Sequence, residues 1–186
     1  CNIAWRWMRG AYIDMRYGKM LARVPSASAS ERYSNMPMNY YVLRAIFDQI
    51  AITPDDVLVD VGCGDGRVLN FWLSRYQNRL IGIEIDAATA ASAIRRYRHR
   101  LHVKIIHGDA AQEAARSGGT VFLLYNPFGK RTMDRFEQSL RSQRCTIVYY
   151  NYSHLDVFEN GRWQIQQVEK LVPHYCQYRV AFINPL

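Results

Sequence analysis

The chain has 186 residues, 49% of them hydrophobic, and this length and composition fit a single domain with its own core. Its formal net charge of +8 favours an anionic partner or surface but does not identify any chemistry. Apolar runs such as residues 121–125 are far shorter than the roughly 20 residues that a membrane-spanning helix needs, so we expect no integral membrane segment.

The four cysteines lie far apart and form neither a C-x-x-C pair nor a cluster with zinc-ligand spacing. They are Cys1, Cys63, Cys145 and Cys176. This pattern predicts a reducing, cytoplasmic compartment and no metal site. Because the chain begins at Cys1 and not at a methionine, the sequence leaves open whether an upstream anchor or signal has been removed.

Residues 5–23 are predicted to form a basic amphipathic helix, with Trp5, Met8, Tyr12 and Met15 at helical spacing among arginines and lysines. We favour a packing arm or lid whose aromatic face covers the main domain. The alternative is a helix that lies on an acidic membrane surface. The small polar residues 26–30 then predict a loop. We therefore expect an N-terminal arm over residues 1–36 and a catalytic domain over residues 37–186.

The catalytic domain opens with a predicted helix that carries Leu43, Ile46, Phe47 and Ile50. Short buried strands then alternate with helical stretches such as 68–76 and 87–98. The predicted strands are 57–61, 80–85, 103–107, 120–125 and 146–150. This alternation predicts an α/β fold, a mostly parallel sheet covered by helices on both faces.

The tail of the chain departs from this alternation. Residues 163–172 and 175–183 have only Pro173 and His174 between them. Two residues are too few for a crossover helix, so the two strands should pair antiparallel as a C-terminal hairpin.

A glycine-rich turn lies between the first strand of the domain and the next helix. Glycine is needed at Gly62, Gly64 and Gly66, where a side chain would obstruct unusual backbone angles or the close approach of a ligand. The spacing is G-x-G-x-G, unlike the G-x-G-x-x-G of a dinucleotide site, and Asp60 precedes the first glycine by two positions. A carboxylate so close to the turn suits a cationic ligand such as S-adenosylmethionine better than a pyrophosphate. The small Cys63 packs within this turn and is not expected to act as a nucleophile.

Residues 60–67 resemble motif I of the class I S-adenosylmethionine-dependent methyltransferases, and the similarity extends over residues 37–186. The resemblance implies a Rossmann-like, seven-strand methyltransferase sandwich and S-adenosyl-L-methionine as cofactor. It also implies that Glu84, after the second strand, holds both ribose hydroxyls, and that Asp109, after the third, meets the adenine amino group with Ala110 beside the ring. The expected cofactor contacts are Asp60, Gly62, Cys63, Gly64, Gly66, Glu84, Ile85, Asp109, Ala110 and Asn126.

Each acidic residue also has a purely structural interpretation. Asp60 could cap a turn, Glu84 could end a strand in solvent, and Asp109 could cap the helix over residues 110–116. We prefer cofactor binding because the glycine turn, the acid after strand two and the Gly-Asp pair after strand three occur in the order that the family has.

The fourth strand ends in Tyr125-Asn126-Pro127-Phe128-Gly129, at the sheet edge where open α/β sheets place functional groups. This segment is similar to the Asn-Pro-Pro-Tyr/Phe motif of amino-group methyltransferases, which implies that Asn126 and the Pro127 carbonyl orient an acceptor nitrogen and that Phe128 stacks on the substrate. The second proline of that motif is missing here, so the acceptor is not identified. The structural alternative is a turn in which Asn126 satisfies its own backbone.

The expected activity is therefore methyl transfer to an unidentified acceptor, an amine of a protein or of a small molecule. The alternatives are a nucleic-acid N-methyltransferase, a non-catalytic module that binds nucleic acid or a membrane surface, and a Rossmann oxidoreductase. Weak contact with an anionic surface or nucleic acid is compatible with the basic run 95–100, although we prefer to interpret this run as a solvated helix end. His154 is a weaker candidate for a general base.

Overall fold

We analysed a computed structural model of the chain, which describes residues 3–16, 38–169, 171 and 179–186. The predicted loop at 26–30, Pro37, and the turn at Pro173 and His174 lie outside the described residues. Seven strands form one sheet in the order β3-β2-β1-β4-β5-β7-β6. The strands are β1 (Val57–Val61), β2 (Arg79–Glu84), β3 (Val103–His107), β4 (Val121–Tyr125), β5 (Thr146–Tyr150), β6 (Trp163–Val168) and β7 (Val180–Pro185).

The first five strands are parallel, and β7 pairs antiparallel with both β5 and β6. The predicted architecture, mostly parallel with an antiparallel C-terminal pair, is therefore confirmed. The expected strand lengths in the tail are wrong, because β6 ends at Val168 and β7 begins at Val180. The sequence pattern of these segments does not show at which residue the pairing between the two strands ends.

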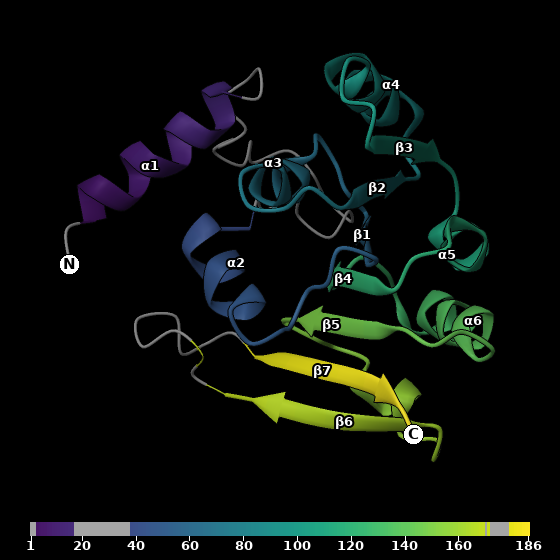
Figure 1. The fold of residues 1–186 in the computed structure, drawn as a ribbon. Coiled ribbons are helices and arrows are strands. Elements are labelled where there is room, and N and C mark those ends of the chain that lie inside the picture. Colours follow the sequence, from purple (N-terminus) through teal and green to yellow (C-terminus); the bar gives the residue numbers. More distant parts are fainter. Residues whose placement is uncertain (1–2, 17–37, 170, 172–178) are drawn as a thin grey trace.

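Helices cover both faces of the sheet (Figure 1). They are α1 (Ile3–Arg16), α2 (Tyr40–Phe47), α3 (Arg67–Leu73), α4 (Ala87–Tyr97), α5 (Ala110–Ser117), α6 (Lys130–Leu140) and the 3₁₀ turn η1 (Leu155–Phe158). One core cluster joins the sheet to α5, α6 and η1, and the other joins it to α2, α3 and Tyr97 of α4.

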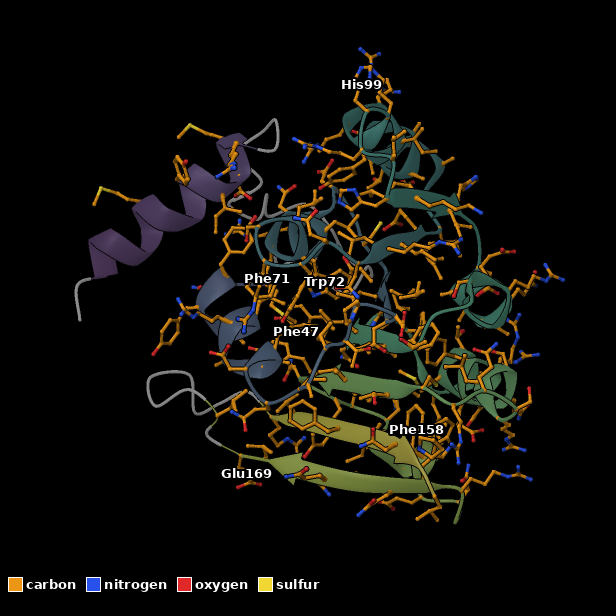
Figure 2. The ribbon with its side chains drawn as sticks, in the orientation of Figure 1. Phe47, Phe71, Trp72, His99, Phe158 and Glu169 are labelled. Carbon is orange, nitrogen blue, oxygen red and sulfur yellow. The ribbon has the colours of Figure 1, made fainter. Side chains whose placement is uncertain are left out.

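Strand β4 shows why the central strands read as continuous apolar runs. Val121 and Leu123 point into one core cluster, while Phe122 and Leu124 point into the other. A parallel strand with helices on both faces needs apolar side chains at every position. On the α2–α3 face, Phe47 lies edge-on to Trp72, with ring centroids 5.5 Å apart, and 5.9 Å from Phe71 (Figure 2).

The N-terminal helix predicted over residues 5–23 is confirmed up to Arg16, residues 17–23 lie outside the described residues, and the helix packs through a different face than expected. Met8, Tyr12 and Met15 are exposed, with 63%, 59% and 63% of their surface in solvent, so the prediction that these side chains cover the domain is wrong. The contact is made by Asp14, which is fully buried, and by Ile13, which is partly buried. The side chain of Trp5 lies outside the described part of the structure. Within the part of the chain that the structure describes, no helix has the length and apolar character needed to cross a bilayer.

Candidate functional site

The glycine turn lies at the carboxyl edge of the sheet, between β1 and α3 (Figure 1). The backbone N–H groups of Gly62 and Cys63 both donate to the Ile83 carbonyl, at 2.9 and 3.0 Å, and so tie the turn to β2. Gly82 makes this approach possible, because a Cβ there would lie 2.6 Å from the Cys63 sulfur. A glycine inside a strand indicates such a close approach. Our predictions from the sequence did not use this signal at Gly82.

Left-handed backbone explains the glycines of the turn. Gly62, Gly64 and Gly66 have φ angles of 76°, 53° and 90°, which L side chains rarely adopt. At Gly66 space is also short, since a Cβ would lie 2.5 Å from the hydroxyl oxygen of Tyr97. The predicted need for glycine at these three positions is therefore met by the geometry.

Glu84 ends β2 with its carboxylate beside the turn. Oε2 accepts a hydrogen bond from the Gly64 N–H and Oε1 accepts one from the Asp86 N–H, both at 2.9 Å. Each oxygen of a carboxylate has two lone pairs, so each can accept one more donor. The residue is thus a fixed acceptor pair rather than a solvated strand end.

Asp60 and Cys63 lie deeper, beneath the turn. Burial, with a smaller contribution from the Glu84 charge, raises the pKa of Asp60 to about 8. Burial and the neighbouring carboxylates of Asp60 and Glu84 also raise the pKa of the Cys63 thiol well above its usual range. The thiol is therefore neutral and unreactive, in agreement with a packing role.

The next strand end along the edge carries Asp109 and Ala110. Asp109 caps α5, since Oδ1 accepts from the Ala111 N–H at 2.9 Å, and its Oδ2 lies 3.0 Å from Arg135. The structural interpretation of Asp109 is thus correct, and any ligand contact must share these oxygens. Ala110 is buried, whereas Ile85, which follows Glu84, is 71% exposed beside this edge.

The segment after β4 brings the acceptor candidates to the same edge. Asn126 has a φ of 43°, the left-handed region that costs a non-glycine residue free energy. Pro127 packs against the glycine turn, because its Cβ lies 3.3 Å from where a Cβ on Gly62 would be. Phe128 is partly buried against Phe136 of α6, with ring centroids 5.7 Å apart, so part of its ring serves the core.

Tyr149 is a site residue that sequence reasoning missed. This fully buried side chain of β5 donates its hydroxyl proton to Asn126 Oδ1 at 3.1 Å, and its oxygen lies 3.4 Å from the N–H groups of Ser153 and His154. Asn126 thus binds a side chain and not its own backbone. A tyrosine in a buried strand looks like any other core aromatic, so no local signal marks it. His154 meets this network through its backbone N–H.

The fold and this edge define a class I, Rossmann-like methyltransferase arrangement, and comparison with known proteins agrees. Residues 58–142 match the family model described as a methyltransferase domain. No curated protein matches the chain.

Three solved structures illustrate the structural similarity. An RNA methyltransferase from Salinibacter ruber, in complex with S-adenosyl-L-homocysteine, has a TM-score of 0.61 and 22% identity over 81% of this chain and 93% of that chain. The pyocyanin biosynthetic protein PhzM has a TM-score of 0.61 and 15% identity over 76% of this chain, which spans 54% of PhzM. The methyltransferase domain of bacterial CtHen1 has a TM-score of 0.60 and 13% identity, over 79% of this chain and 97% of that chain.

At these identities the structures show the fold, and the family model shows the activity. Residues 58–142 match the methyltransferase-domain family, and the solved structures show the class I, Rossmann-like methyltransferase fold over about four fifths of the chain. It is an enzyme that uses S-adenosyl-L-methionine to methylate an acceptor, and the oxidoreductase alternative is wrong.

Proposed function

We propose that the edge built by the ends of β1, β2, β3 and β4 binds S-adenosylmethionine and presents its methyl group to an acceptor nitrogen at Asn126. The observation that carries the proposal is the Glu84 carboxylate, which two backbone N–H groups hold with one lone pair free on each oxygen. Two neighbouring ribose hydroxyls match two neighbouring acceptor oxygens.

The charge around the turn also fits this cofactor. Four acidic residues lie at or near it, Asp60, Asp65, Glu84 and Asp109, in a chain whose formal net charge is +8. Asp65 and Asp109 have arginine partners, Arg96 and Arg135, and the pKa of about 8 keeps the buried Asp60 mostly neutral at pH 7. The Glu84 carboxylate is therefore the main source of negative charge from which a sulfonium and an amino group would gain.

The adenine would lie between Ile85 and Ala110. An isoleucine that is 71% exposed in the protein gains free energy when an aromatic ring covers it. Asp109 retains lone pairs that could accept from the adenine amino group, in addition to its bonds to Ala111 and Arg135.

At the acceptor side, Asn126 Oδ1 already accepts from Tyr149 and has a second lone pair for the N–H of an acceptor. The bound cofactor supplies the methyl group, and the protein aligns the neutral nitrogen with it and excludes water. An amine of a protein or small molecule is the acceptor class that we favour. A nucleic-acid base nitrogen is the alternative outcome of the acceptor search.

The cofactor assignment is tested by isothermal titration of S-adenosylhomocysteine against the wild-type chain and Glu84→Ala. Loss of two charge-assisted hydrogen bonds should weaken binding at least tenfold, because such bonds contribute roughly 1.5 to 3 kcal/mol each. Glu113→Ala provides a matched control, since Glu113 is also a carboxylate near this edge but pairs with Arg116 on the surface of α5. Equal affinity of the wild type and Glu84→Ala would refute the assignment.

A further inference from the structure

Helix α1 contributes a buried carboxylate that packs against the rest of the protein. Asp14 is fully buried, and Tyr40 donates a short hydrogen bond to its Oδ1. Arg67 Nη1 lies 3.2 Å from Oδ2, and Asn70 Nδ2 lies 3.5 Å from Oδ1. A carboxylate without water is stable only when its partners hold it in a fixed place, so Asp14 constrains these partners as they constrain it.

Two of these partners belong to the first turn of α3, directly after the glycine turn. Arg67 is the residue after Gly66, its side chain is only 15% exposed, and its guanidinium lies 4.5 Å from the centre of the Tyr40 ring. An ion pair on one side and an aromatic ring on the other hold this guanidinium in place. The backbone that leaves the glycine turn is thereby fixed from the direction of α1.

A second route leads back to the turn itself. The Tyr97 hydroxyl lies 2.7 Å from Asn70 Oδ1 and 2.7 Å from the carbonyl oxygen of Gly66. The Gly66 N–H in turn donates to the Cys63 carbonyl at 2.8 Å. The single hydroxyl proton of Tyr97 can be donated to one of these two oxygens at a time. Asp14, Asn70, Tyr97 and Gly66 thus form a chain of close polar contacts, in which each member is buried or lies in the turn.

We propose that Asp14 is a positioning residue for cofactor binding, so that the N-terminal helix supports the cofactor site through a side chain that does not itself contact the ligand. Three left-handed glycines give the turn a large conformational freedom when nothing restrains it, and affinity improves when a binding loop is held in its bound shape beforehand. The inference rests on the proposed function, because it requires the cofactor to bind at this turn.

The test compares Asp14→Asn with wild type in the full 186-residue chain. Calorimetric titration with S-adenosylhomocysteine should show affinity reduced about tenfold, because binding would then have to order the glycine turn. Hydrogen exchange of the ligand-free protein should show faster exchange of the amides at residues 64–67, with unchanged exchange in β5. A purely structural anchor would lower thermal stability and leave both the affinity and the exchange at the turn unchanged, and that result would overturn the proposal.

Asp48→Asn is the matched control. Asp48 also pairs with an arginine next to α3, but this partner is Arg75, beyond the far end of the helix. The control should leave both readouts at wild-type values, and a loss of affinity as large as that of Asp14→Asn would contradict a specific role for Asp14.

Tyr97→Phe provides a second test of the proposal if Asp14→Asn does not fold. It removes only the hydroxyl that connects Asn70 to Gly66 and retains the ring behind the turn. Weaker binding with faster exchange at the turn supports a role for these contacts, and wild-type values for both contradict it. If Glu84→Ala also binds normally, the proposed site fails; if Glu84→Ala binds weakly while Asp14→Asn and Tyr97→Phe bind normally, only this inference fails.

Discussion

Asn126 combines a strained backbone with a fixed side chain. Its φ of 43° is unfavourable for a residue with a Cβ, and its amide oxygen is held by the hydroxyl of the buried Tyr149. Two backbone N–H groups approach the Tyr149 oxygen, so the hydroxyl proton is left for Asn126. The amide oxygen therefore has a defined position and one lone pair directed elsewhere, which suits a group that orients an acceptor.

Two substitutions test the roles of Asn126 and Tyr149. Asn126→Gly removes the amide and tolerates the left-handed backbone, so it should leave S-adenosylhomocysteine affinity within about twofold and reduce methyl transfer by about 10- to 1000-fold. Tyr149→Phe removes one hydroxyl and should reduce transfer by a smaller factor. The assay measures the transfer of labelled methyl groups into the fraction of a cell lysate that the wild-type protein methylates.

A structural role for Asn126 predicts a different effect on methyl transfer. Under either role, Asn126→Ala places a Cβ in the same strained backbone, so its free energy of unfolding should be about 1 kcal/mol lower than that of Asn126→Gly. If Asn126 only completes a turn, transfer by Asn126→Gly should equal that of wild type. Such a result would remove Asn126 from the acceptor site.

At the scale of elements, one buried carboxylate connects α6 to the first residue of β6 and to the turn before it. Glu137 is 1% exposed, and three residues donate to it: Arg141 from the same helix, Asn160 at 2.8 Å and Trp163 at 2.9 Å. Burial raises the pKa of Glu137, but the hydrogen bonds from Arg141, Trp163 and Asn160 outweigh it and hold the pKa below its usual value. The contact joins helix and sheet on the face opposite α2 and α3.

Glu137→Gln should lower the free energy of unfolding at pH 7 by about 2 kcal/mol, because hydrogen bonds to a charged acceptor are replaced by weaker ones. A depressed folded pKa means that the stabilisation is present above the unfolded pKa of about 4.3 and is lost as pH falls through the folded pKa. Urea unfolding should therefore show the gap between wild type and variant narrowing below about pH 4. The exposed Glu159→Gln should show no gap, and an equal gap at pH 7 and pH 3 would contradict an electrostatic origin.

The central elements were predictable because their signals are local. Short β-branched or apolar runs predicted β1, β3 and β5 with their observed bounds, and the glycine spacing predicted the turn after β1. The face on which α1 packs was not predictable in this way. Periodicity favours burial of Met8 and Tyr12, but the partners that bury Asp14 are Tyr40, Arg67 and Asn70, distant in sequence, and no local pattern reports them. The link from Tyr97 to the glycine turn is hidden for the same reason.

At the scale of the whole molecule, the charge is unevenly distributed. Four of the sixteen acidic residues lie at or near the glycine turn, whereas residues 87–107 contain no acidic side chain and five basic ones. Of these five, Arg96 is engaged with Asp65, and the other four are exposed; these are Arg95, Arg98, Arg100 and Lys104. Three of them, Arg98, Arg100 and Lys104, line a shallow groove of about 370 Å³ beside the edge strand β3. His99, just after α4, marks this region of the molecule in Figure 2.

We expect this basic edge to bind polyanions weakly and without sequence preference. Phosphate contacts give affinity that falls steeply with salt, and no recognised reader of base sequence accompanies the charge. The double substitution Arg98→Gln with Lys104→Gln should reduce the slope of log affinity for single-stranded RNA against log salt by about 1 to 2, because each lost phosphate contact reduces it by roughly 0.7. S-adenosylhomocysteine binding should be unchanged.

The matched control removes the same charge at the other end of the sheet. Arg144 and Arg162 are exposed and lie next to β5 and β6, whereas β3 is the strand at the opposite edge. If the basic edge is the contact surface, Arg144→Gln with Arg162→Gln should keep the wild-type slope. If both double variants lose the same amount, only the net charge of the chain matters. Nanomolar binding of one RNA or DNA sequence at physiological salt would contradict weak, unspecific contact and would make a nucleic-acid base the acceptor to test first at Asn126.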